Sequence, residues 1–206
     1  GGVLPAPVDP RVNLTRQPWS QPGVFDAMTS SVRLRQELDA GWRWTTQYGA
    51  QRLKTDDNLI FGYGCSANND YSQYCADGSF DLYDYRSNNE RRLTDALQTE
   101  IAGQLQIGNL RHDLTFGLSR QRQLDRMPPM QSYNYNNTPG SVFTSFNSSA
   151  SPSYVTPNTN RSEYSTELSI KDRVQLSDTT SVWAGLRNVA YNRSSVQNEH
   201  TDQTVL

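Results

Sequence analysis

The feature that most constrains the fold is a long two-residue alternation of apolar and polar side chains between residues 93 and 121. Leu97 and Ile101 fall on one side, and after Gly108-Asn109 the alternation resumes with Leu114 and Phe116. A period of two predicts β-strands, and an Asn beside a Gly between two such runs predicts a tight hairpin. The chain is therefore expected to be all-β and antiparallel.

This alternation fits two environments, in which the apolar face of the sheet points in opposite directions. Each run exceeds the roughly five or six residues of an ordinary strand, and about 9–11 tilted residues suffice to cross a bilayer. A soluble sandwich directs its apolar face toward a core, whereas a membrane barrel directs it toward lipid and its polar face toward a wet lumen. The pattern of these two strands alone leaves both open.

The amino-acid composition argues against several classes of structure and partner. Hydrophobic residues make up 34% of the 206 residues, the mean hydropathy is -0.76 and the net charge is -2. Disorder is a poor explanation, because the apolar residues fall in periodic runs and the chain carries 11 Tyr, 6 Phe and 4 Trp. No basic stripe suggests nucleic acid, and no apolar run approaches the roughly 18 residues of a membrane helix.

Two cysteines, Cys65 and Cys75, lie ten residues apart in a polar stretch. An even count within one loop predicts a disulfide and an oxidising compartment, with a pair of free thiols as the alternative. Closing such a loop is worth about 3 kcal/mol on the chain-entropy model.

About six long strands follow from the whole chain, starting near residues 24, 42, 80, 110, 162 and 180. Short turns join them in pairs, as at Asp39-Ala40-Gly41 and Ser177-Asp178-Thr179, and long loops span about Thr55–Ser79 and Gln123–Asn160. In the last strand a bulge near Asn188 could exchange the two faces. Charged residues expected to point inward are Arg33, Arg35, Arg43, Glu100, Glu163, Glu167, Lys171 and Arg173.

The connections alternate between short and long, so short turns gather at one end of the sheet and long loops at the other. Structureless loops of this length are uncommon in compact soluble domains. An outer-membrane barrel has this organisation. Trp42 and Trp44 lie at a short-turn end, where an aromatic girdle belongs.

A succession of weakly characteristic segments runs over most of the chain, with no single decisive motif. These segments are Val8-Asp9-Pro10-Arg11, Gln17-Pro18-Trp19-Ser20-Gln21-Pro22, Gly41-Trp42-Arg43-Trp44, Tyr74-Cys75-Ala76-Asp77-Gly78, Tyr85-Arg86-Ser87-Asn88-Asn89-Glu90-Arg91-Arg92, Thr94-Asp95-Ala96-Leu97 and Trp183-Ala184-Gly185-Leu186-Arg187. Through them the chain resembles the barrel of a TonB-dependent outer-membrane receptor of the ferric-siderophore type.

The resemblance implies that residues 1–206 are part of a transmembrane β-barrel in the bacterial outer membrane, with short periplasmic turns and long extracellular loops. Barrels of this family are 22-stranded and have a plugged lumen. A chain of about six strands would therefore be an internal portion of such a barrel, without the plug domain or the remaining strands. The implied partners are outer-membrane lipid, a ferric siderophore or similar bulky chelate, and TonB acting through the absent plug. Iron would be held only within the siderophore complex, so no cofactor or protein metal ligand is expected.

Aromatic side chains in the long loops are the candidate ligand-binding residues, because rings among Asn and Ser make adaptable binding surfaces. The alternative is that they pack the loops against one another. These residues are Trp19, Tyr63, Tyr71, Tyr74, Tyr133, Tyr135, Phe143 and Phe146.

No catalytic residue is expected, and the chain is not predicted to be an enzyme. His112 begins a strand, with no Ser, Cys or Asp spaced to form a triad or dyad with it. The sequence therefore predicts a transport receptor. The alternative is a soluble secreted β-sandwich that acts as an adhesin or carbohydrate-binding module.

Overall fold

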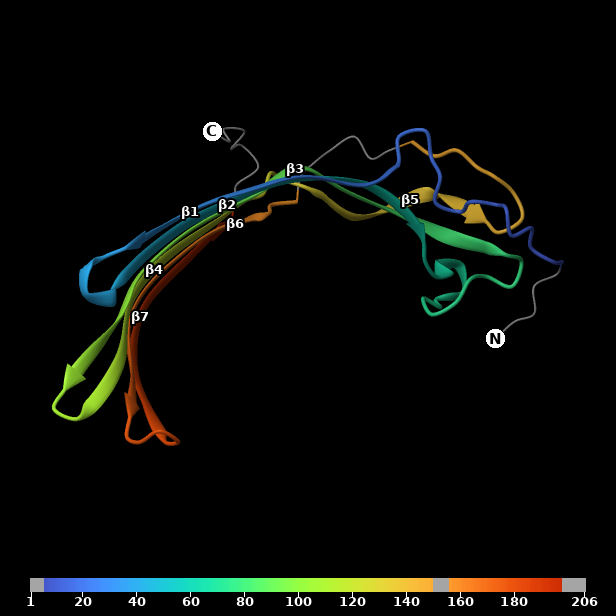
Figure 1. Ribbon diagram of the computed structural model, residues 1–206. Helices are drawn as coiled ribbons and strands as arrows, with labels where there is room; N and C mark the ends of the chain where they lie inside the picture. The colour runs from blue at the N-terminus through green and yellow to red at the C-terminus, as the bar shows by residue number, and fades with distance from the viewer. Residues whose placement is uncertain (1–5, 150–155, 198–206) are drawn as a thin grey trace.

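Seven antiparallel strands form one open sheet in the computed structural model, which describes residues 6–149 and 156–197, with the backbone alone for 131–138 (Figure 1). The long strands lie in the order β1-β2-β3-β4-β6-β7, and β5 pairs with the first part of β3. The expected all-β class and six-stranded antiparallel meander are thus confirmed, in a sheet that is not closed. The elements are β1 (Gln21–Glu37), the 3-10 turn η1 (Asp39–Gly41), β2 (Arg43–Gly62), the 3-10 turn η2 (Ser66–Asn68), β3 (Ser79–Ile107), β4 (Leu110–Arg126), β5 (Gln131–Ser141), β6 (Thr159–Gln175) and β7 (Ser181–Gln197).

The two ends of the sheet carry different connections, as the alternation of turns and loops predicts. The turns β1–β2, β3–β4 and β6–β7 gather at the lower left of Figure 1, and the longer connections lie at the opposite end. Gly108 closes the β3–β4 hairpin with a φ of 60°, a left-handed conformation that glycine adopts without strain. We call these the turn end and the loop end.

The strands at the loop end are longer than the alternation predicts. β2 continues to Gly62, β4 reaches Arg126, and β5 forms inside the segment expected to be a loop. The expected loops Thr55–Ser79 and Gln123–Asn160 therefore begin too early, and the second also contains β5, whereas their far ends agree with the starts of β3 and β6. The reason is that backbone pairing continues between residues that are polar on both faces, such as Asn58 and Arg86, where no apolar period remains to signal a strand.

A β-bulge in β3 changes which residues share a face. The β2–β3 register shifts between Thr55 and Asp57, and opposite this shift Asn89 has a φ of 60° and donates its backbone N–H to Asp56 Oδ1 at 2.6 Å. The extra residue places Leu82 on the same face as Leu93, although an odd number of positions separates them. The bulge expected near Asn188 is wrong, because β6 and β7 pair without interruption.

The register assigns each face of the sheet a distinct chemistry. Two neighbouring rows across the six long strands make the contrast. One row is Gln36, Trp44, Ile101, Phe116, Ile170 and Leu186. The adjacent row, on the other face, is Arg35, Thr45, Glu100, Gly117, Ser169 and Arg187.

The polar face lies on the inside of the bend. Figure 1 shows the sheet arched, with the 63–78 loop under its right-hand end. Ser66 in that loop bonds to Asp81, which shares a face with Tyr83 and hence with the polar side of β2. We therefore call the charged face concave and the apolar face convex. The apolar band is the convex face near the turn end, from Leu97 to Leu105 on β3 and the residues in register with them.

The protein's own hydrophobic core sits only at the loop end. Phe80 and Leu82 are fully buried with Ile60 and Val142. In the apolar band, by contrast, Ile101 is 41%, Leu168 57% and Leu186 78% exposed. Within the described residues, no second layer covers the apolar band.

Candidate functional site

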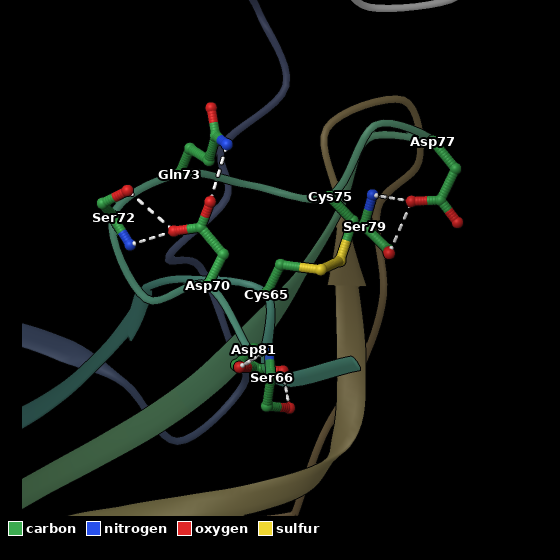
Figure 2. The surroundings of a disulfide bond; sticks show 9 residues. All are labelled: Cys65, Ser66, Asp70, Ser72, Gln73, Cys75, Asp77, Ser79 and Asp81. Carbon is green, nitrogen blue, oxygen red and sulfur yellow. Dashed lines mark hydrogen bonds between the residues drawn. A yellow bond between two sulfur atoms is a disulfide. The ribbon is translucent and has the colours of Figure 1, made fainter. Parts of the chain in front are cut away.

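A disulfide-bonded loop connects β2 to β3 at the loop end (Figure 2). Cys65 and Cys75 are joined, with their Cα atoms 5.1 Å apart. The carboxylate of Asp81 accepts hydrogen bonds from the backbone N–H of Ser66 at 2.7 Å and from its hydroxyl at 2.9 Å. The loop is thus tied covalently to itself and by hydrogen bonds to β3.

Two further carboxylates organise the loop by capping short turns. Asp70 accepts hydrogen bonds from the N–H and hydroxyl of Ser72 and from the amide of Gln73. Asp77 accepts the same pair of bonds from Ser79. These bonds favour the ionised form, so the pKa of each carboxyl lies below its ordinary value, led by the Ser72 hydroxyl for Asp70 and the Ser79 hydroxyl for Asp77.

Four of the predicted ligand-binding aromatics pack the loops together instead. They surround Phe80, whose ring lies 4.8 Å from that of Tyr74 and 6.2 Å from that of Phe146. Trp19 and Phe143 pack against the same cluster, and the Trp19 indole donates to the carbonyl of Ser148 at 3.0 Å. We call Phe80, these four rings and the aliphatic residues Leu14, Ile60, Leu82 and Val142 the Phe80 cluster.

Glycine and glutamine hold the Phe80 cluster closed. A Cβ on Gly62 or Gly140 would collide with the Phe80 ring, so only glycine lets the two strands flank it. Gln17, which is 4% exposed, donates its amide to the carbonyl of Phe146 at 3.1 Å and accepts the N–H of Ser148 at 2.6 Å. The segment before β1 is therefore anchored to the loop after β5.

The structure assembles a different set of rings on the concave face. Phe61 and Tyr83 stack with centroids 5.9 Å apart and planes at 20°, and Tyr63 meets Tyr83 edge-on at 6.4 Å. Tyr63 is 55% exposed, so this aromatic platform (Phe61, Tyr63 and Tyr83) presents ring surface to solvent. Such a platform can bind a flat or aromatic ligand by stacking.

A charged belt crosses the concave face beside the aromatic platform. Glu90 is 7% exposed and accepts hydrogen bonds from Ser87 at 2.5 Å, Thr55 at 3.1 Å and Arg92 at 3.0 Å. Asp57, beyond the apolar band on β2, has its pKa raised by burial and by the nearby Glu90 carboxylate. The charged belt therefore reaches the part of the concave face next to the aromatic platform.

The belt continues across the later strands through bridging arginines. Arg161 pairs with Asp125 at 2.7 Å and with Glu163 at 3.3 Å, and Arg193 pairs with the same Glu163 at 3.4 Å. Toward the turn end, the concave face carries a further pair, Arg187 with Glu167 at 3.7 Å.

The charged residues predicted to point inward share this face by register. Arg33, Arg35 and Arg43 lie on β1 and β2, Glu100 on β3, and Glu163, Glu167, Lys171 and Arg173 on β6. Some of them pair with other side chains of the sheet: Arg35 pairs with Glu37 at 2.7 Å, and Arg173 with Asp113 at 3.9 Å.

A polar groove of about 1010 Å³ lies on the other side of the loop end, between the segment before β1, β2 and residues 145–147. Arg11 and Arg16 line it, and the guanidinium of Arg11 pairs with Asp9 at 2.9 Å. That contact lowers the pKa of the Asp9 carboxyl. The groove is separate from the aromatic platform, because its strand lining includes Ile60 of the Phe80 cluster.

Three predicted aromatics remain, namely Tyr71, Tyr133 and Tyr135. Tyr71 is 48% exposed beside Gly64. Tyr133 and Tyr135 fall in β5, and their side chains lie outside the described residues. Sequence reasoning missed Phe61 and Tyr83, because both were hidden in segments that showed no apolar alternation.

His112 belongs to neither group and lies on the convex face. Its Nδ1 is 2.8 Å from Asp172 Oδ2, diagonally across the β4–β6 pair, because His112 is in register with Val174 and Asp172 with Leu114. Among the described residues, no cluster of three or more His, Cys, Asp or Glu side chains is placed to hold a metal ion. In the same part of the chain, no helix is both long and apolar enough to cross a membrane.

Compared with known protein families and with curated proteins, the sequence finds no match.

Proposed function

We propose that this chain is part of a transmembrane β-barrel in the bacterial outer membrane, belonging to a TonB-dependent receptor that binds and imports a ferric siderophore or a similar bulky solute. The observation that carries the proposal is the direction of the bend. A curved sheet in a soluble protein gathers apolar side chains on its concave side, whereas this one gathers ion pairs there and leaves its apolar side outward and uncovered. A membrane barrel has that arrangement.

Aromatic placement at the turn end supports the same proposal. Trp42 stacks on Phe116 at 6.4 Å, and Trp44 donates its indole N–H to Thr99 at 2.8 Å. Trp42 lies toward the turn end of the apolar band, beside Gly103, and Trp44 lies in register with Ile101. Indoles with one apolar side and one satisfied polar atom suit the interface between lipid and water.

The open edges support a larger barrel. Among the described residues, β1 and β7 each pair along one side only, and both are 17 residues long. Exposed edges of that length are prone to aggregation unless further strands cover them.

The aromatic platform and the charged belt support solute binding on the inner side. The rings offer stacking surface, and the nearby arginines offer charge to an anionic chelate. The transported ligand would carry its own iron, and the plug domain and TonB would supply the energy coupling.

The test uses the natural gene in its own host, grown with and without iron. The protein is expected in the outer-membrane fraction, to rise under iron starvation, and to be cleaved by added protease on intact cells within residues 63–78. A soluble or secreted protein that is indifferent to iron would overturn the proposal and favour the β-sandwich binding module.

Solute binding is tested by uptake of radioactive iron presented on a catecholate, a hydroxamate and a citrate chelator. Tyr83→Ala removes the central ring of the aromatic platform and should lower uptake of the transported complex. Tyr71→Ala, an exposed ring at the same end, is the matched control. Equal uptake by all three proteins would exclude the platform as the binding surface.

A further inference from the structure

Six cations gather on the convex face at and beyond the loop-end boundary of the apolar band. They are Arg52 and Lys54 on β2, Arg91 on β3, and Arg120, Arg122 and Arg126 on β4. At the opposite boundary of the band, the described part of the convex face carries His112 beside Asp172 and no Lys or Arg. The surplus of positive charge is therefore confined to one boundary.

Register brings like charges directly against one another in this group. Lys54 pairs with Arg91, and Arg91 pairs with Arg126, so three cations stand in one row across three strands. Like charges directly opposite in a sheet are destabilising. Such a row is costly unless an anion lies over it.

The carboxylates on this face do not balance the group. Arg52 pairs with Asp95 at 2.6 Å and Lys54 with Asp56 at 2.9 Å, and Asp26 lies opposite Lys54. Three acids against six bases leave a surplus of three positive charges. Among the described residues, Arg120 has no ion pair, and Arg122 stands opposite Asp95, whose own ion pair is with Arg52.

An apolar groove lies next to Arg120 along β4, and Arg122 lies two residues farther along the same face. The groove has a volume of about 490 Å³ on the convex face of β3, β4, β6 and β7. Arg120 lies two residues beyond Leu118 on the same face of β4, about 7 Å along the strand at the usual rise. The apolar convex side chains that line the groove are Ile101, Phe116, Leu118, Leu168, Ile170 and Leu186.

We propose that Arg120 and Arg122 bind the phosphate of an anionic lipid whose acyl chain lies in this groove. The inference rests on the proposed membrane location. It adds that the lipid is selected by charge and that it belongs to the leaflet on the loop side. A guanidinium pair above an apolar groove matches a molecule that joins a phosphate to a hydrocarbon chain, whereas a free anion would gain nothing from the groove.

The experiment uses the purified full-length protein, stripped of lipid in a neutral detergent and titrated with dioctanoylphosphatidylglycerol or dioctanoylphosphatidylcholine. Bound lipid is counted by native mass spectrometry. The anionic lipid should bind more tightly, and the double variant Arg120→Gln, Arg122→Gln should lose about 30-fold in affinity for it, at about five-fold for each cation removed.

Two control proteins separate this site from general charge effects. The double variant Arg33→Gln, Arg35→Gln removes the same charge from the concave face and should bind as the wild type does. The variant Arg120→Lys, Arg122→Lys keeps the charge and should retain the preference for the anionic lipid. If the glutamine variant fails to assemble, weakening of wild-type binding with added salt tests the same charge dependence.

The result that overturns the inference is equal affinity of the wild type for the two lipids, or an equal loss in the concave-face control. Full displacement of the anionic lipid by an equal concentration of inorganic phosphate would also overturn it, since the site would then be one for a free anion. Fractionation of cells tests membrane location separately. A protein found in the membrane without lipid preference therefore refutes this inference alone.

Discussion

The two ends of this sheet satisfy their apolar side chains in different ways. At the loop end, Phe80 and Leu82 are 1% and 0% exposed, because the segment before β1 and the loop after β5 cover them. At the turn end, Ile101 and Leu186 are equally apolar but remain 41% and 78% exposed. One end buries its apolar side chains within the protein, and the other leaves them on the surface.

This contrast means that apolar patterning does not by itself locate a core. Burying apolar surface stabilises by roughly 25 cal/mol per Å² wherever the water is removed from it. At the loop end other parts of the chain remove it. At the turn end we propose that lipid does, and the four predictions below test the contrast from its largest effect to its smallest.

Phe80→Ala should have the largest effect, because it empties the centre of the Phe80 cluster. Truncating a buried Phe costs about 3–5 kcal/mol. Guanidinium unfolding of the protein in lipid vesicles measures the loss, and protease should cleave residues 63–78 faster. By comparison, Tyr71→Ala removes an exposed ring from the same loop and should change neither the free energy of unfolding nor the rate of cleavage. Equal effects of the two substitutions would contradict a packed core at this end.

Ile101→Arg tests the turn end, where we place the side chain against lipid. A charge near the middle of a lipid-facing strand costs about 2–4 kcal/mol in a membrane barrel. Gln98→Arg on the same strand but the concave face is the matched control, and it should cost little. Assembly into vesicles reports both. If the two variants assembled alike, the apolar band would not face lipid.

Removing the disulfide tests whether the loop end owes its order to a covalent bond. Cys65→Ser with Cys75→Ser should cost about 3 kcal/mol from the loop-closure entropy alone. Cleavage of residues 63–78 by protease should accelerate, and the wild type should respond in the same way to a reductant. Thiol labelling of the unreduced, denatured wild type should find no free cysteine; two labelled thiols would refute the bridge.

The same contrast separates what the sequence predicts from what it does not. Strands of the apolar band are predictable because one face is uniformly apolar, and this asymmetry gives a clear period of two from Leu97 to Leu118. The end of β2 is not, because Asp56 and Asn58 face one side and Asp57 the other, so both faces are polar. Pairing there depends on a partner strand that the local sequence does not reveal.

The sequence predicts that aromatic residues form the candidate site, but it does not predict which aromatic residues these are. Loop aromatics were identified from composition, and four of them turn out to pack around Phe80. The ring stack that faces the concave side needs Phe61 and Tyr83 in register across β2 and β3. That register depends on the bulge at Asn89, whose conformation only the assembled sheet specifies.

The smallest expected effect comes from pH, and it separates two turns within the loop end. The pKa values of Asp70 and Asp77 lie below the ordinary value of 3.8, so their stabilising effect is complete above that pH. It is lost as the pH falls through the lower folded values, because protonation removes the acceptor that binds Ser72 or Ser79. The amide NMR signals of Ser72 and Ser79 should therefore shift with midpoints below 3.8. Asp70→Asn should abolish the response of Ser72 while leaving that of Ser79, and a midpoint above 3.8 in either signal would show that these caps do not hold the loop.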